Sequence, residues 1–309
     1  MRFYPADKLA PLLAWRPLVD ALEAQFRLDV TAPVRHHHEI GQPGTLLLMP
    51  AWSGGLAGVK LVTVYPENPA RSLPSIQGIY CLFDAATGTP LAAMDAATIT
   101  LHRTAAASVL AARYLARANS RRLLLLSTGR LAPYIARAYV AVLGIDRVHV
   151  WGRRPERAAA VAAELASGGL DARAVPDPNA ALDDADIVSC ATMSGAPLFD
   201  GARLRPGTHV DLIGGFTPTM RESDDETMRR STIYVDTRDG ALSEAGDLIQ
   251  PIQAGVIAET DIRGDLFDLC RGRIPGRTSD ASITLFKSVG TALEDLAAAE
   301  LVYRKTLAS

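Results

Sequence analysis

The sequence predicts an α/β protein with a doubly wound parallel sheet, because strand-like and helix-like segments alternate through its second half. The segment LLLLS at 123–127 is a continuous apolar run, which is typical of a strand buried on both faces. A glycine-containing turn and a helix at about 131–143 follow it, and then a second strand (148–151) and helix (155–166). Further strands are expected at 172–175, 186–191, 209–213 and 232–236. Such alternation with short connections indicates parallel βαβ units.

The first half of the chain predicts a smaller unit of mixed helices and strands. We expect one helix over 6–28, whose apolar face carries Trp15, Leu18, Val19, Leu22 and Phe26. Expected next are strands at 45–50, 57–65 and 76–84 and a long alanine-rich helix from Asp95 to about Ala118. The spacing of apolar residues from Val289 onward predicts a last helix.

Composition excludes several classes of function. The formal net charge is −2, from 32 basic and 34 acidic residues among 309, which gives no electrostatic reason to expect a nucleic acid or an anionic membrane as partner. Three widely spaced cysteines argue against a disulfide framework and against a zinc cluster. The first residues show no secretory signal pattern, and no apolar run approaches the roughly 18 residues needed to span a bilayer. We therefore expect a cytoplasmic protein.

The turn after 123–127 is the first candidate for a dinucleotide site. A buried strand, a turn and a helix form the phosphate cradle of Rossmann folds, where the helix N-terminus offers free N–H groups to the pyrophosphate. The usual G-x-G-x-x-G/A turn is degraded here, because Ser127 replaces the first glycine while Gly129 and Ala132 keep the second and third positions. An ordinary strand-to-helix turn is the alternative. The expected cofactor contacts in this turn are Thr128, Gly129, Arg130 and Leu131.

The end of the second strand indicates which dinucleotide is bound. Gly152, Arg153 and Arg154 stand where an acidic residue would hold the ribose 2′-hydroxyl of NAD, and arginine there suits the 2′-phosphate of NADP. A solvated basic turn is the alternative. The sequence thus predicts NADPH as the cofactor, with NADH as a weaker alternative.

Several longer segments resemble one family of enzymes. They are PVRHH (33–37), LLLMPAW (46–52), GVKLVTVYPEN (58–68), FDAATGTPLAAMDAATITLHRTAA (83–106) and LFKSVGTALEDLAAA (285–299). In this order they resemble the ornithine cyclodeaminase/μ-crystallin family over nearly the whole chain. That resemblance implies a Rossmann domain (116–289) inserted into a smaller α/β domain (1–115 plus 290–309) that binds substrate and forms a homodimer. It also implies a small α-amino or α-imino acid as substrate.

The resemblance further implies a set of site residues. Arg35, Lys60 and Arg103 match the family's substrate-carboxylate site, with Lys60 and Arg103 in catalytic positions, and an arginine fork suits a planar carboxylate. Taken singly, each has an ordinary alternative as a surface charge or an ion pair. If the three converge, buried cations need an anionic ligand, and Lys60 beside two arginines should have a depressed pKa. The remaining implied cofactor contacts are Ser75, Gln77, Arg103, Thr104, Thr192, Ile213 and Ser288.

One departure from the family pattern bears on the chemistry. Cyclodeaminases and alanine dehydrogenases of the family carry an aspartate after a glycine pair, whereas DLIGGF at 211–216 places Phe216 there. Phenylalanine cannot accept a proton, so ornithine deamination is disfavoured. Reduction of a cyclic imine depends mainly on positioning and is still possible. Phe216 is then expected to contact the substrate ring.

The predicted activity is therefore NADPH-dependent reduction of a cyclic imino acid, because DLIGGFTPTMRESDDE and the C-terminal segment are most similar to bacterial Δ1-pyrroline-2-carboxylate/Δ1-piperideine-2-carboxylate reductases. The products would be proline or pipecolate. The alternatives are a cyclodeaminase or alanine dehydrogenase-like enzyme, and a crystallin-like protein that binds NADPH without turnover.

Two further features receive ordinary interpretations. The run His36–His38 is expected to be a surface or interface cluster rather than a metal site, because neighbouring residues of a strand point to opposite faces. Cys190 is expected to be a packed small residue, since it has no histidine near it in sequence. No metal site is predicted.

Overall fold

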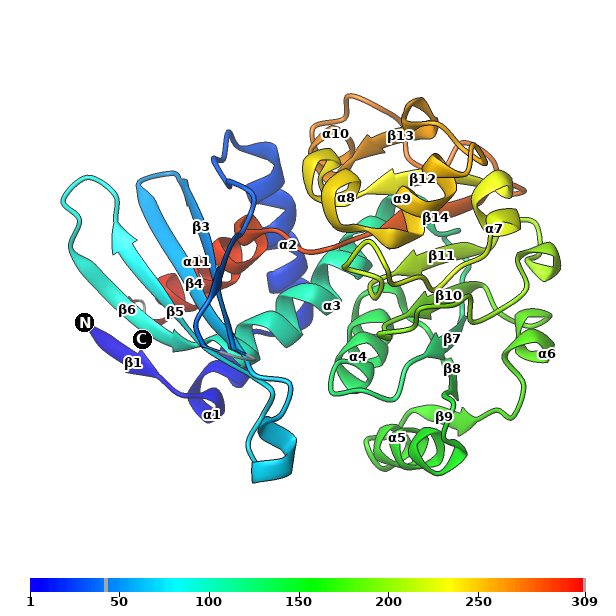
Figure 1. Ribbon diagram of the computed structural model, residues 1–309, viewed down its shortest axis with the longest axis horizontal. Coiled ribbons are helices and arrows are strands. Elements are labelled where there is room, and N and C mark those ends of the chain that lie inside the picture. Colours follow the sequence, from blue (N-terminus) through cyan, green and yellow to red (C-terminus); the bar gives the residue numbers. More distant parts are fainter. Residues whose placement is uncertain (42–43, 308–309) are drawn as a thin grey trace. The chain divides into compact units, whose positions relative to one another are not determined.

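The chain forms two compact units in this computed structural model, which describes residues 1–41 and 44–307 (Figure 1). Unit 1 comprises Met1–Thr104 and Gly290–Ser309, and unit 2 comprises Ala105–Val289. The first division lies inside helix α3 (Ala96–Leu115), whereas the sequence placed the boundary at residue 115. The second lies between residues 289 and 290. Unit 2 is thus inserted in the chain of unit 1.

Unit 1 is built on a six-stranded sheet with the order β1-β6-β5-β4-β3-β2. Only β1 and β6 are parallel, and the other pairs are antiparallel. The strands are β1 (Arg2–Tyr4), β2 (His36–Glu39), β3 (Thr45–Ser53), β4 (Leu56–Val64), β5 (Ile76–Asp84) and β6 (Pro90–Asp95). Helix α11 (Ala292–Leu307) packs on β3, β4 and β5 and against α2 (Trp15–Arg27). The predicted strands at 45–50, 57–65 and 76–84 are confirmed.

The single helix expected over 6–28 is wrong. The structure has α1 (Ala6–Leu9), a 3-10 turn (Ala10–Leu12) and then α2, with Leu13 and Ala14 outside helical geometry. In a continuous helix the ring of Pro17 would clash with the carbonyl of Leu13. Beginning a new helix at Trp15 places Pro17 in its first turn, where proline is tolerated. The predicted apolar face is retained, since Leu18, Val19, Leu22 and Phe26 are all buried.

Unit 2 is a Rossmann-type parallel sheet with the order β9-β8-β7-β10-β11-β14-β12-β13. Every pair in it is parallel, and the sequence β9-β8-β7-β10-β11 is the 3-2-1-4-5 order of a doubly wound fold. The predicted fold class is confirmed. The strands are β7 (Arg122–Leu126), β8 (Arg147–Trp151), β9 (Asp171–Ala174), β10 (Ile187–Cys190), β11 (His209–Leu212), β12 (Ser231–Val235), β13 (Ile262–Asp265) and β14 (Ile283–Lys287).

Helices connect these strands. They are α4 (Ala132–Leu143), α5 (Pro155–Ser167), α6 (Pro178–Leu182), α7 (Asp225–Arg230), α8 (Arg238–Glu244), α9 (Gly246–Gln253) and α10 (Leu266–Cys270), with 3-10 turns at Gly201–Arg203 and Glu259–Asp261. In unit 1 a further 3-10 turn spans Asn68–Arg71. No helix in the part of the chain that the structure describes is both long and apolar enough to cross a bilayer.

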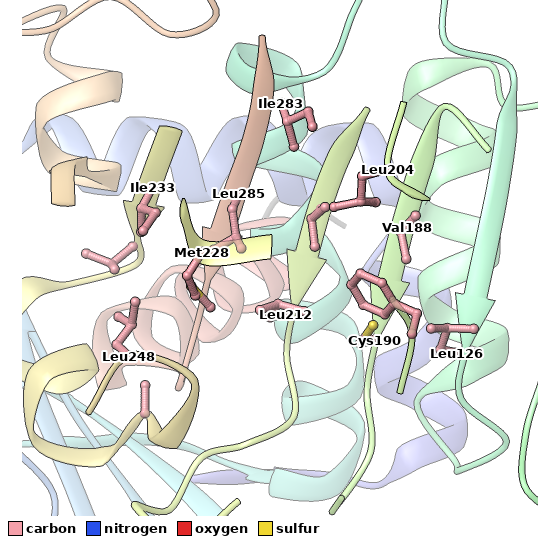
Figure 2. Close-up of a cluster of buried hydrophobic side chains, with 14 of the residues drawn as sticks. Leu126, Val188, Cys190, Leu204, Leu212, Met228, Ile233, Leu248, Ile283 and Leu285 are labelled. Carbon is pink, nitrogen blue, oxygen red and sulfur yellow. The ribbon is translucent and has the colours of Figure 1, made fainter. Parts of the chain in front are cut away.

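A cluster of buried hydrophobic side chains in unit 2 lies on one side of this sheet (Figure 2). It contains Leu126, Val188, Leu212 and Leu285 from four neighbouring strands, together with Cys190, all of them fully buried. Cys190 is therefore a packed small residue, as expected, and burial raises the pKa of its thiol. Because β8 and β10 flank β7 on opposite sides, the strand order reverses at β7. Ligands of such sheets bind outside the carboxyl ends of the strands at this point.

Candidate functional site

The charged residues expected in the substrate site of unit 1 lie together. Lys60 is on β4 and 2% exposed, with its Nζ 2.8 Å from Asp295 Oδ2 and 3.0 Å from Oδ1. Asp295 is on α11 and has no exposed surface. The packing of α11 on the sheet therefore brings a carboxylate to a lysine 235 positions earlier in the chain.

Arg103, on α3, shares the same carboxylate. Its Nε lies 3.0 Å from Asp295 Oδ1, and its Nη1 lies 2.6 Å from Glu294 Oε2. Burial disfavours the charged form of Arg103, but the Asp295 and Glu294 carboxylates outweigh it and raise its pKa. Burial also disfavours the Asp295 carboxylate, and Lys60 and Arg103 outweigh it, so the pKa of Asp295 is lowered. Each charged group of the cluster therefore depends on its partners, because removing one of them would leave an uncompensated buried charge.

Arg35 joins this cluster through a glycine. Its Nη2 donates a 2.8 Å hydrogen bond to the carbonyl of Gly290. Gly290 has φ +80°, and a Cβ built there would lie 2.4 Å from Arg103 Nη1. Only glycine both adopts this backbone conformation easily and leaves room for the Arg103 guanidinium. Gly290 thus contacts both arginines: its carbonyl binds Arg35, and its lack of a side chain leaves room for Arg103.

Two of the three cations already have anionic partners within the protein. Asp295 and Glu294 compensate Lys60 and Arg103, so the convergence of these cations does not by itself require an anionic ligand, contrary to the expectation from the sequence. The third cation, Arg35, is only partly buried and is joined to Arg103 through Gly290. Sequence reasoning missed Asp295 and Glu294, and the one signal for them was a pair of acids within the otherwise apolar helix segment ALEDLAAA.

The expected depression of the Lys60 pKa is confirmed. Burial is its main cause, the charges of Arg103 and Arg35 add to it, and Asp295 opposes it, so the pKa falls to about 8. Tyr80 faces Lys60 directly across β4 and β5. Its hydroxyl is fully buried, and burial raises the pKa of this phenol well above its ordinary value. Near neutral pH Lys60 is thus mostly an ammonium that can release its proton more readily than an exposed lysine.

In unit 2 the turn after β7 has the features of a phosphate cradle. A Cβ built at Gly129 would meet only Ser127 Oγ, at 3.9 Å, so the protein itself leaves the space over this backbone open. Ser127 is buried and donates a 2.8 Å hydrogen bond to the carbonyl of Ala191, which ties the turn to the end of β10. The first turn of α4 contains no acidic residue, and Leu131 is its N-cap. An anion is therefore favoured at this helix N-terminus.

The predicted ribose-phosphate contacts lie beside this turn. A Cβ at Gly152 would meet Thr128 Cγ2 at 2.4 Å, so the end of β8 packs directly against the turn after β7. Arg153 and Arg154 follow and are exposed, as is Arg130. None of these three arginines has an ion pair within the described residues. Their charges are therefore available to an anionic ligand.

The remaining predicted residues are divided between the units. In unit 2, Ile213 and Ser288 are buried near strand ends, and Phe216 lies on the following loop with 41% of its surface exposed. In unit 1, Gln77 is exposed and Ser75 and Thr104 are half-buried. The role of each of these residues stays a prediction.

Thr192 leads to a buried charge network in unit 2 that sequence reasoning missed. Its N and Oγ1 donate hydrogen bonds of 2.6 and 2.7 Å to Glu222 Oε1. Asp247 Oδ1 accepts from the N–H of Glu222 at 2.9 Å, and Lys287 Nζ lies 3.3 Å from Asp247 Oδ2 and donates to the carbonyl of Gly214. Burial raises the pKa of Glu222 to about 7, although Lys287 opposes this. The network fixes the backbone at Thr192 and at the glycine pair before Phe216.

The histidine run lies on β2, at the edge of the unit 1 sheet, and is exposed. The rings of His36 and His38 are 6.5 Å apart, as expected for alternate residues of a strand. Within residues 1–41 and 44–307 no three histidine, cysteine or acidic side chains gather in a way that suits a metal ion.

Comparison with known proteins identifies similar enzymes. The chain is 44% identical to a Δ1-pyrroline-2-carboxylate reductase of Paracoccus denitrificans, over 94% of this chain and 93% of that protein. The structure of the Thermococcus litoralis Δ1-pyrroline-2-carboxylate reductase with NADH and L-proline matches with a TM-score of 0.94 and 34% identity, over 100% and 98% of the two chains. An archaeal alanine dehydrogenase dimer with bound NAD matches with a TM-score of 0.91 and 30% identity, over 99% and 96%.

The family model described as "Ornithine cyclodeaminase/mu-crystallin family" matches residues 10–309. The match covers both segments of unit 1 after residue 9 and the whole of unit 2. The chain belongs to the ornithine cyclodeaminase/μ-crystallin family.

Proposed function

We propose that this protein reduces a cyclic imino acid with NADPH, converting Δ1-pyrroline-2-carboxylate to L-proline, Δ1-piperideine-2-carboxylate to L-pipecolate, or both. The observation that carries the proposal is the buried pair of Lys60 and Arg103, which Asp295 holds together and which Arg35 joins through Gly290, because three cations brought together in this way suit the carboxylate of an imino acid. The relatives support the assignment of the chain as an imine oxidoreductase that uses a nicotinamide cofactor.

In this proposal the arginines bind and orient the substrate. Arg35 and Arg103 carry planar guanidinium groups that can take both oxygens of a carboxylate, and Lys60 adds a point charge beside them. Holding the carboxylate fixes the adjacent C=N carbon, and correct placement of the reacting carbon supplies much of the rate enhancement. Phe216 would give the ring methylenes an apolar surface.

The cradle of unit 2 would hold the cofactor. When bound, the reduced nicotinamide supplies the hydride for the C=N carbon. The backbone around Gly129 and the N-terminus of α4 would receive the pyrophosphate, and Arg153 with Arg154 would receive the 2′-phosphate. Because no acidic residue follows β8 directly, a free 2′-hydroxyl has no carboxylate partner there, which favours NADPH over NADH.

We also propose a homodimer in the cytoplasm. One face of the unit 1 sheet carries α11, and the opposite face presents a row of half-buried apolar side chains that includes Leu48, Leu61 and Ile79 on adjacent strands. Trp52, in β3 on the same face, is 45% exposed. An extended apolar surface of this kind is typical of a subunit interface. The three cysteines are free thiols, which suits a reducing compartment.

The first prediction concerns activity. Purified protein should oxidise NADPH, followed by its absorbance, when Δ1-pyrroline-2-carboxylate or Δ1-piperideine-2-carboxylate is added. L-Ornithine with NAD should give no reaction, because Phe216 replaces the family's aspartate. Tight NADPH binding without turnover of either imine would contradict the proposed function and favour a binding protein.

The second prediction concerns cofactor choice. Arg153→Ala should lower kcat/KM for NADPH roughly 10- to 100-fold and leave the value for NADH nearly unchanged, since it removes a charge-assisted bond to the 2′-phosphate. Arg203→Ala is the matched control, because Arg203 is an arginine of the same unit paired with Asp183 at the surface. Equal losses with both cofactors would rule out a 2′-phosphate contact.

The third prediction concerns Phe216. Phe216→Asp should lower kcat/KM for imine reduction about tenfold or more, because a charge replaces an apolar contact with the ring. Phe216→Leu keeps an apolar side chain and should stay close to the parent protein. If the aspartate variant turns over at the parent rate, Phe216 does not contact the ring.

The fourth prediction concerns the dimer. In sedimentation experiments the protein should be dimeric at micromolar concentration, and Leu61→Glu should shift it towards monomer because it buries a charge in the interface. Leu28→Glu, at another apolar position of unit 1 that is 47% exposed, should leave the dimer intact. A monomeric parent protein would exclude this interface.

A further inference from the structure

We propose that Asp295 is a positioning residue of the substrate site, which fixes Lys60 and Arg103 against each other and keeps Lys60 in its ammonium form as the proton donor to the imine nitrogen. The inference deepens the proposed function and rests on it for the identity of the substrate. The protonation of Lys60 itself can be measured without any turnover.

The geometry gives Asp295 this position. Both of its oxygens lie within 3.0 Å of Lys60 Nζ, and Oδ1 also accepts from Arg103 Nε at 3.0 Å. Its side chain has no exposed surface, and it is carried by a helix that packs on three strands of the sheet. Because the Asp295 carboxylate is buried and contacts both cations, it has little freedom to move. It therefore fixes the positions of Lys60 and Arg103 before a substrate binds.

Several charged and polar groups from neighbouring elements surround Lys60 and influence its protonation. Arg103 on α3 and Arg35 before β2 disfavour the ammonium, as does burial itself. Tyr80 on β5 is a neutral phenol, and Thr100 on α3 contributes a hydroxyl 3.4 Å from Nζ. Glu294 forms an ion pair with Arg103, with 2.6 Å between Oε2 and Nη1. Asp295 is the carboxylate in direct contact with Lys60, and it opposes all the groups that would remove the proton.

The reaction has a definite proton requirement. The C=N carbon gains a hydride with its electron pair from the reduced nicotinamide, which is oxidised as the imine is reduced. The nitrogen gains one proton from the Lys60 ammonium, and the electron pair of the broken N–H bond stays on Lys60 as a neutral amine. A proton from water then restores the ammonium. A lysine with a pKa of about 8 is charged at neutral pH and still able to donate.

The experiment is a pair of pH profiles of kcat/KM for imine reduction. The parent protein should lose activity as the pH rises through about 8, because the reaction needs protonated Lys60. Asp295→Asn removes the charge that favours the ammonium, so this limb should move to lower pH by about one unit or more. Glu294→Gln is the matched control on the same helix: it weakens the hold on Arg103 and should raise KM without moving the limb. A limb that stays in place in Asp295→Asn would overturn the proposal.

A second measurement reads Lys60 directly. The chain has four lysines, at positions 8, 60, 287 and 305, so ε-13C-lysine labelling gives a simple NMR spectrum in which Lys60→Arg identifies the Lys60 signal. In the parent protein this signal should titrate near pH 8, and in Asp295→Asn at a lower pH. Titration near the ordinary value of about 10.4 would overturn the proposal even if Asp295→Asn fails to fold. If the imines are not reduced but Lys60 titrates as described, Asp295 controls Lys60 and the proposed substrate is wrong.

Discussion

The charged cluster of unit 1 depends on one buried carboxylate. Asp295 contacts both Lys60 and Arg103, and neither cation could be desolvated without such a partner. The three residues come from α11, β4 and α3, so the site exists only when the C-terminal helix returns to the sheet after the whole of unit 2. The geometry of the cluster and the folding of unit 1 are therefore coupled. A change at Asp295 acts on both.

Unit 2 also contains a buried ion pair between a lysine and an aspartate. Lys287, at the end of β14, is fully buried and pairs with Asp247, which in turn accepts hydrogen bonds from the backbone near Glu222. This network holds the glycine pair before Phe216 and the segment of Thr192. In both units a buried lysine and a buried acid give fixed positions to loops or side chains that would otherwise have many conformations. Ion pairs of this kind specify a geometry more than they add stability.

The sequence predicted the parts of the fold that follow from local patterns. The continuous apolar run at 123–127 identified β7, and the alternation of strand-like and helix-like segments identified β8 and α5 after it. Sequence patterns did not predict the features that depend on contacts between residues far apart in the chain. Strand β14 ends in Lys287, a residue that is unexpected in a buried strand until Asp247 is known to face it. Asp295 was missed for the same reason, because nothing near it in sequence reveals that Lys60 and Arg103 will be its partners.

In the proposed reaction the charge of the cluster changes during turnover. Lys60 in its ammonium form would favour an anionic substrate, because its positive charge adds to those of Arg35 and Arg103. Proton transfer from Lys60 would remove that charge and weaken the hold on the product carboxylate. Return of a proton to Lys60, which Asp295 favours, would prepare the cluster for the next substrate.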